Sequence, residues 1–239
     1  MADSPLAGRQ ISFIGCGAMA RALAGGLVES GVPTSQIRAS DPFAAARQQF
    51  QDSVGAETHE TNADVVRDAD VVILAVKPGM VVQVLQGLDP ALCEKPLWIS
   101  IAAGVPLDRL ESALPGGARI VRTMPNTPAL VGAGATAYFP GPNVGETDLE
   151  LVEACLEAAG WCWRAPNEGL LDAVTGLSGS GDQGIPTATA AASVEAPALG
   201  RGALHRGSID LKPGEAVDLL LASVTEEAGD LRFAGGAIV

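Results

Sequence analysis

Two glycines near the amino end, Gly15 and Gly17, have the spacing with which dinucleotide-binding proteins hold a diphosphate. Gly15 permits a sharp turn from a strand into a helix, and Gly17 permits a bound group to approach the backbone closely. The first N–H groups of the following helix carry partial positive charge and have no partner within that helix. Ala20 takes the third position of the pattern, where alanine still allows helix and strand to pack. These residues predict a site for the pyrophosphate of a nucleotide cofactor.

A strand and a helix are needed on either side of this turn. Residues 11–14 are mostly apolar and β-branched, as in a buried strand, and the residues from Ala18 onward favour helix. Gly31 stands where a residue of left-handed conformation ends a helix. A Gly-x-Gly pattern also occurs in purely structural turns. Its place between an apolar strand and a helix favours the cofactor site.

Ser40, Asp41 and Pro42 follow a second predicted strand at 36–39, where a dinucleotide-binding fold meets the adenosine ribose. The carboxylate of Asp41 would accept hydrogen bonds from the ribose hydroxyls and repel a 2′-phosphate. The hydroxyl of Ser40 would instead donate to that phosphate. The three residues are also typical of an ordinary turn, so NAD and NADP both stay open as cofactors.

Further apolar runs alternate with helical stretches and predict an α/β fold, with an N-terminal Rossmann-type, doubly wound parallel sheet. The expected strands are at 56–58, 71–76, 97–101, 119–123, 135–139 and 160–164, and the expected helices at 44–51, 62–68, 106–114 and 148–159. Asn62 is expected to cap the helix at 62–68. Ligands of open α/β sheets bind beyond the carboxyl ends of the strands. Four residues are therefore placed to touch the cofactor: Ala75, Val76, Lys77 and Pro78. Lys77 is also compatible with a solvated strand end.

Charge and composition limit the partners. The formal net charge is −13, which argues against nucleic acid and anionic membranes as partners. We expect no signal peptide in residues 1–10 and no membrane span later. The four cysteines, Cys16, Cys93, Cys155 and Cys162, lack metal-ligand spacing and predict free thiols in a reducing cytoplasm. The two histidines are isolated, so no metal site is expected.

The chain resembles the pyrroline-5-carboxylate reductase family in five pieces that occur in the family's order. They are IGCGAMARALAGGL, ADVVILAVKP, SIAAGV, VRTMPNTPALVGAGATA and LLDAVTGLSGSG, and together they cover most of residues 11–181. Hydroxyacid dehydrogenases and coenzyme F420-dependent NADP reductases share this N-terminal fold. The specific pieces MPNTP and SGSG favour the pyrroline-5-carboxylate reductases over both.

The resemblance implies reduction of 1-pyrroline-5-carboxylate to L-proline, with hydride from NADPH or NADH. It places Gly15, Ala18 and Met19 in the pyrophosphate loop, and Asn62 with residues 75–78 on the ribose and nicotinamide side. Two further groups match positions against the nicotinamide and near the reacting centre: Ala102, Ala103 and Gly104, and Pro125, Asn126 and Thr127. Hydride transfer to an imine needs neither a protein nucleophile nor a metal, so no catalytic residue is assigned. Family members form dimers through interlocked helical domains.

The resemblance is interrupted after Gly181, where Asp182 and the residues after it replace the family's Pro-Ala-Tyr. Further on, Glu226 and Glu227 follow Val224-Thr225 where the family has small residues that bind substrate. We therefore expect a dinucleotide-binding domain at 1–165 and a smaller, all-helical substrate and dimerisation domain at 166–239 that is truncated. Homo-oligomers would then be weakened. The alternative to an active reductase is a dinucleotide-binding remnant of the family without turnover.

Overall fold

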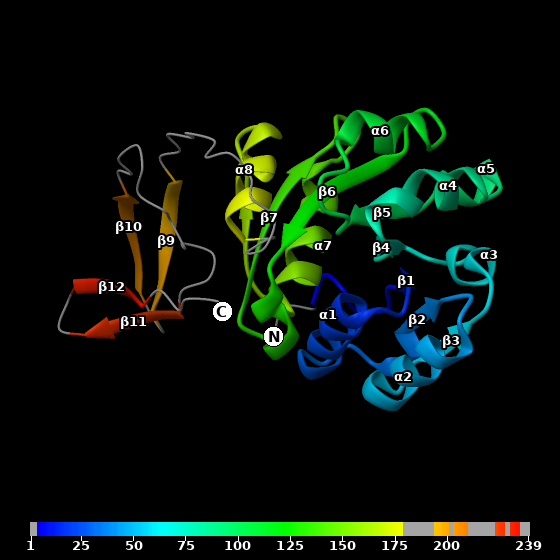
Figure 1. Cartoon of the computed structure of the whole chain (residues 1–239), viewed down its shortest axis with the longest axis horizontal. Coiled ribbons are helices and arrows are strands. Elements are labelled where there is room, and N and C mark those ends of the chain that lie inside the picture. The colour runs from blue at the N-terminus through cyan, green and yellow to red at the C-terminus, as the bar shows by residue number, and fades with distance from the viewer. Residues whose placement is uncertain (1–3, 179–193, 201–202, 210–222, 228–229, 235–239) are drawn as a thin grey trace.

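The structure is a computed structural model that describes residues 4–178, 194–200, 203–209, 223–227 and 230–234. Its main feature is a single sheet of eight strands with helices against both faces (Figure 1). The strands are β1 (Ile11–Ile14), β2 (Ile37–Ser40), β3 (Glu57–His59), β4 (Val71–Leu74), β5 (Leu97–Ser100), β6 (Arg119–Pro125), β7 (Gly134–Pro140) and β8 (Gly160–Arg164).

Eight helices and three 3₁₀ turns connect or follow these strands in the part of the chain that the structure describes. They are α1 (Ala18–Glu29), η1 (Thr34–Gln36), α2 (Ala44–Val54), α3 (Asn62–Val66), η2 (Pro78–Met80), α4 (Val81–Gln86), α5 (Pro90–Cys93), α6 (Leu107–Ser112), η3 (Thr127–Val131), α7 (Glu146–Glu157) and α8 (Gly169–Ser178). The predicted strands and helices up to residue 164 are confirmed, with ends that differ by a few residues. For the residues after Pro78 the sequence leaves a loop or a helix open, and the structure has η2 and α4 there. Helix α5 was not predicted, because it is a single turn that begins with Pro90, and proline also suits a loop.

The strand order is β3-β2-β1-β4-β5-β6-β7-β8. From β3 to β6 every neighbouring pair is parallel. Ile14 is in register with Ser40 on one side and Leu74 on the other, so β1, β2 and β4 end at the same level. The order reverses between β1 and β4, and such a switch point is where open α/β sheets bind ligands.

One strand corrects the prediction of a wholly parallel sheet. β7 runs antiparallel to β6, with Pro125 opposite Thr136 and Val121 opposite Pro140, whereas β8 is parallel to β7. The reason is the short connection between β6 and β7, which contains only η3 and its flanking residues. A parallel return needs a crossover of a dozen or more residues. The sheet is therefore mostly parallel and Rossmann-like.

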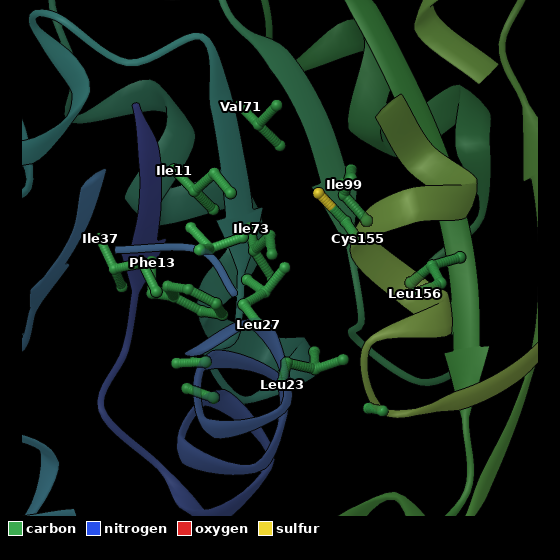
Figure 2. Close-up of a cluster of buried hydrophobic side chains, with 14 of the residues drawn as sticks. Ile11, Phe13, Leu23, Leu27, Ile37, Val71, Ile73, Ile99, Cys155 and Leu156 are labelled. Atoms are coloured by element: carbon green, nitrogen blue, oxygen red, sulfur yellow. The ribbon is translucent and has the colours of Figure 1, made fainter. Parts of the chain in front are cut away.

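Alternate residues of each central strand enter different cores, as the two-residue period of a strand requires. Ile11, Phe13 and Ile73 face a core that α1, α2 and α7 cover (Figure 2). Ile14 and Trp98 face the other core, which α3 to α6 cover. Because both faces are buried, the strands are almost continuously apolar, and this is why the sequence revealed them.

Beyond the sheet, helix α8 agrees with the helix expected at the start of the second domain. Four short strands follow: β9 (Val194–Gly200), β10 (Ala203–Ile209), β11 (Ser223–Glu227) and β12 (Asp230–Ala234). They form two antiparallel pairs, β9 with β10 and β11 with β12.

These strands differ from the all-helical domain that the sequence predicts for 166–239. At β9 the difference has a local cause, since Pro197 lacks the N–H that an interior helical residue donates. The sequence also predicts a short helix around the leucines at 219–221, which lie outside the described residues. The division of the chain at residue 165 stays a prediction. Within the described residues, no helix has the length and apolar character that a bilayer crossing requires.

Candidate dinucleotide site

The glycine turn lies at the switch point and brings two strand ends together. Gly15 has a φ of +103°, and its N–H donates to the carbonyl oxygen of Ser40 at 2.7 Å. A Cβ atom built on Gly15 would lie 2.6 Å from the carbonyl oxygen of Ala75, at the end of β4. Both the backbone angle and the space therefore require glycine here. The loops after β1 and β4 meet in contact, as the sequence predicts for a shared ligand site.

The start of α1 offers unpaired backbone donors. Gly17 is its N-cap, without a side-chain hydrogen bond, and a Cβ on Gly17 would meet nothing within 4 Å. Among the described residues, no acceptor takes the N–H of Gly17 or of Ala18. The N–H of Cys16, in contrast, donates to Asp41 Oδ2 at 3.1 Å. The amides of Gly17 and Ala18 are thus the ones left to bind an anionic group, and the space in front of Gly17 fits a diphosphate.

The turn after β2 is organised by Asp41. Its Oδ1 accepts the N–H of Phe43 at 2.9 Å, and its Oδ2 accepts the N–H of Cys16. Ser40 is 0% exposed, and its hydroxyl donates to Asn62 Oδ1 at 2.8 Å. In this conformation the Ser40 hydroxyl is bound to Asn62, and a direct contact of Ser40 with the cofactor stays a prediction.

Asn62 lies at the start of α3 but does not cap it, which corrects the expected role. The N-cap is Thr61, whose hydroxyl accepts the N–H of Asp64 at 3.4 Å and donates to the Asp64 carboxylate at 2.6 Å. The side chain of Asn62 is instead held by Ser40 of the neighbouring β2. Asn62 therefore faces the carboxyl edge of the sheet, where the resemblance places it.

The other predicted residues also lie at this edge, at the ends of β4, β5 and β6. After β4, Ala75 and Val76 are half-buried, whereas Lys77 and Pro78 are exposed. After β5, Ala102 is buried, Ala103 is half-buried and Gly104 is exposed, with a φ of +69°. Met19, on the first turn of α1, is half-buried. The structure thus gathers these residues along the carboxyl edge of the sheet. Which of them touch a cofactor stays a prediction.

Pro125 is the last residue of β6, Asn126 follows it, and both are buried. The side chain of Asn126 is 3% exposed, and its Oδ1 accepts the N–H of Ala135 at 2.8 Å. This bond joins the end of β6 to the start of the antiparallel β7. Asn126 thereby has a structural task in addition to the role that the resemblance assigns to it.

Cys16 sits between the two glycines and is fully buried. Burial, together with the negative charge of Asp41, raises the pKa of its thiol to about 12. The thiol is therefore neutral near pH 7 and is no nucleophile. All four cysteines are free, and no group of His, Cys, Asp and Glu side chains in the described ranges could hold a metal ion.

The sequence does not reveal that one arginine of β6 is buried, because an arginine in a strand is usually exposed. The side chain of Arg122 in β6 is 3% exposed and contacts Glu168 Oε1 at 2.6 Å and Asp172 Oδ1. Glu168 also accepts the N–H of Leu107, the first residue of α6, at 2.7 Å. These bonds tie α8 to β6 and to the end of the loop that carries Ala102.

Taken together, the strand order, the glycine turn and the free amides define an NAD(P)-binding α/β domain. A family model described as NADP oxidoreductase, coenzyme F420-dependent, matches residues 10–104, the part that holds the turn. A pyrroline-5-carboxylate reductase of Pseudomonas aeruginosa is 45% identical over 172 residues, which are 72% of this chain and 63% of the relative.

Solved structures agree with these relatives. A pyrroline-5-carboxylate reductase from Coxiella burnetii has a TM-score of 0.69 and 35% identity, over 72% of this chain and 64% of that one. The Plasmodium falciparum pyrroline carboxylate reductase, solved with NADP bound, has a TM-score of 0.65 and 28% identity, over 72% and 63%. The chain belongs to the pyrroline-5-carboxylate reductase family and carries its N-terminal dinucleotide-binding part. It spans less than two thirds of the length of these relatives.

Proposed function

We propose that this chain binds NAD(P)H and reduces 1-pyrroline-5-carboxylate to L-proline, the reaction for which its relatives are named. The observation that carries the proposal is the contact between the Gly15 turn and the end of β4 at the switch point, with the Gly17 and Ala18 amides unpaired. This arrangement suits a dinucleotide laid across the carboxyl edge of the sheet.

NAD(P)H held at this site would supply the hydride for the imine carbon, and the imine nitrogen would take up a proton. The chain's own residues would hold and orient the dinucleotide. The amides of Gly17 and Ala18 bind the diphosphate, and the small residues Ala102 and Ala103 leave room for a flat ring. No described side chain is assigned as proton donor. Catalysis rests on position and on exclusion of water rather than on a nucleophile.

A spectrophotometric assay tests the proposal. Purified chain is mixed with 1-pyrroline-5-carboxylate and NADPH or NADH, and the loss of reduced nicotinamide and the formation of proline are followed together. We expect both, in equal amounts, and we expect neither with a Gly17→Val variant. Dinucleotide binding without proline formation would favour the second candidate, a remnant of the family without turnover. That candidate is favoured by the departure from the family's sequence after Gly181.

We also infer a cytoplasmic location, because the four cysteines are free and three of them are buried. We propose a homo-oligomer, as the resemblance implies, whose association is weakened by the departure from the family's sequence after Gly181. Sedimentation of the full chain measures this directly. A single stable decamer would contradict the weakened association.

A further inference from the structure

Two arginines converge on the adenosine end of the site. Nη1 of Arg21 in α1 donates to the carbonyl oxygen of Cys16 at 3.0 Å, and Nη1 of Arg47 in α2 donates to the carbonyl oxygen of Asp41 at 2.7 Å. One guanidinium thus rests on the glycine turn and the other on the turn after β2. Both side chains are half-buried. These two turns are the segments that border the adenosine ribose in this type of fold.

Neither guanidinium is neutralised by a carboxylate. No ion pair joins Arg21 or Arg47 to an acidic residue in the described part of the chain. Arg21 has one further partner, the neutral amide oxygen of Gln49 at 3.2 Å. A guanidinium carries five N–H donors, so each arginine keeps donors for an anion. The chain has a net charge of −13, so two arginines without an acidic partner at these two turns form a local positive region that suits an anion.

Asp41 is the charge that would oppose an anion here. Its two oxygens already accept backbone N–H groups, from Phe43 and from Cys16, and these bonds stabilise its negative charge. Burial and the charge of Asp41 raise the pKa of the buried Cys16 thiol, whereas the charges of Arg47 and Arg21 lower it. All three charged groups therefore lie near Cys16. The formal sum of one carboxylate and two guanidiniums is positive.

Phe43 adds an apolar surface next to these charges. It follows Asp41 by two residues, directly precedes α2, and is 73% exposed. The exposed ring is open to stacking, and the flat face of an adenine would fit it. The exposed ring thus lies in the turn after β2, whose Asp41 carbonyl oxygen Arg47 contacts.

We propose that Arg21 and Arg47 bind the 2′-phosphate of NADP, that Phe43 stacks on its adenine, and that the chain therefore selects NADP over NAD. The inference rests on the dinucleotide site of the proposed function. It goes beyond that site by assigning the selection to residues on α1 and α2. Hydrogen bonds to a charged group contribute about 1.5–3 kcal/mol, which predicts roughly 10- to 100-fold tighter binding of NADP.

Calorimetric titration of the full chain with NADP⁺ and NAD⁺ tests this selection. We expect Arg47→Ala to weaken NADP⁺ binding roughly 10-fold or more and to leave NAD⁺ binding within about twofold. We expect Phe43→Ala to weaken both dinucleotides equally, by roughly 5- to 150-fold. Arg67→Ala, an exposed arginine at the end of α3, is the matched control and should change neither. Displacement by 2′,5′-ADP but not by 5′-AMP would locate the effect at the 2′-phosphate.

Three outcomes would overturn the assignment. Equal or tighter binding of NAD⁺ by the unmodified chain would contradict the selection itself. An equal loss for both dinucleotides in Arg47→Ala would make Arg47 a structural residue only. Failure of both dinucleotides to bind would overturn the dinucleotide site as well, so the failure of the two proposals can be told apart.

Discussion

Replacement of Gly15 by alanine tests the geometry on which the site depends. At a φ of +103° an L-residue is strained, which costs about 1–2 kcal/mol. The new Cβ would also lie 2.6 Å from the Ala75 carbonyl oxygen, and it would force β1 and β4 apart at their ends. Backbone shifts of this kind cost roughly 1–3 kcal/mol. We therefore expect Gly15→Ala to lower the free energy of unfolding by about 2–5 kcal/mol.

Chemical and thermal unfolding measure this loss. For a domain of this size, about 3 kcal/mol corresponds to a fall in Tm of roughly 6–12 °C. Gly17→Ala is the matched control, since Gly17 has a φ of −68° and its Cβ would meet nothing within 4 Å. It should cost at most about 1 kcal/mol as a change of N-cap. Its methyl group, however, would occupy the space in front of the free amides.

The two variants are therefore expected to separate stability from binding. Gly17→Ala should keep its Tm within a few degrees and bind NADPH at least roughly tenfold more weakly, by fluorescence titration. The main effect of Gly15→Ala should be a loss of stability. The reasoning would be refuted by a Gly15→Ala variant as stable as the unmodified chain, or by a Gly17→Ala variant with unchanged affinity for NADPH.

Two further predictions concern groups away from the cofactor. Arg122→Ala would leave Glu168 without its buried partner, and we expect a loss of about 2–3 kcal/mol in urea unfolding, below the usual 3–5 because both carboxylates reach solvent. The exposed Arg109→Ala should stay within about 0.5 kcal/mol, and an equal loss in both variants would argue against a special role of Arg122. Burial raises the pKa of Cys16 and of Cys155 to about 12 in the folded chain, so the unfolded thiols ionise first. Stability should be unaffected below about pH 8 and fall from about pH 9 to 12, by up to about 1.4 kcal/mol per pH unit for each thiol. A flat profile in that range, or rapid alkylation of both thiols at pH 8 in the native state, would contradict this.

Much of the fold could be predicted from local patterns in the sequence. The apolar strands were visible because both faces of the sheet are buried, which leaves few polar positions in β1, β4 and β5. The glycine turn was visible because its backbone angle and its close approach are properties of one residue type. The family pieces placed the remaining site residues at strand ends, and the fold gathers these ends along one edge of the sheet.

Other features depend on contacts between residues far apart in the chain. The direction of β7 follows from the short connection through η3, and an apolar strand looks the same in either direction. Arg122 is buried beside two carboxylates that come 46 and 50 residues later in the chain, Glu168 just before α8 and Asp172 within it. The residue types in the turn after β2 left NAD and NADP equally open. The balance there depends on Arg21 and Arg47, which two separate helices bring to two adjoining turns, and no local spacing in the sequence encodes that arrangement.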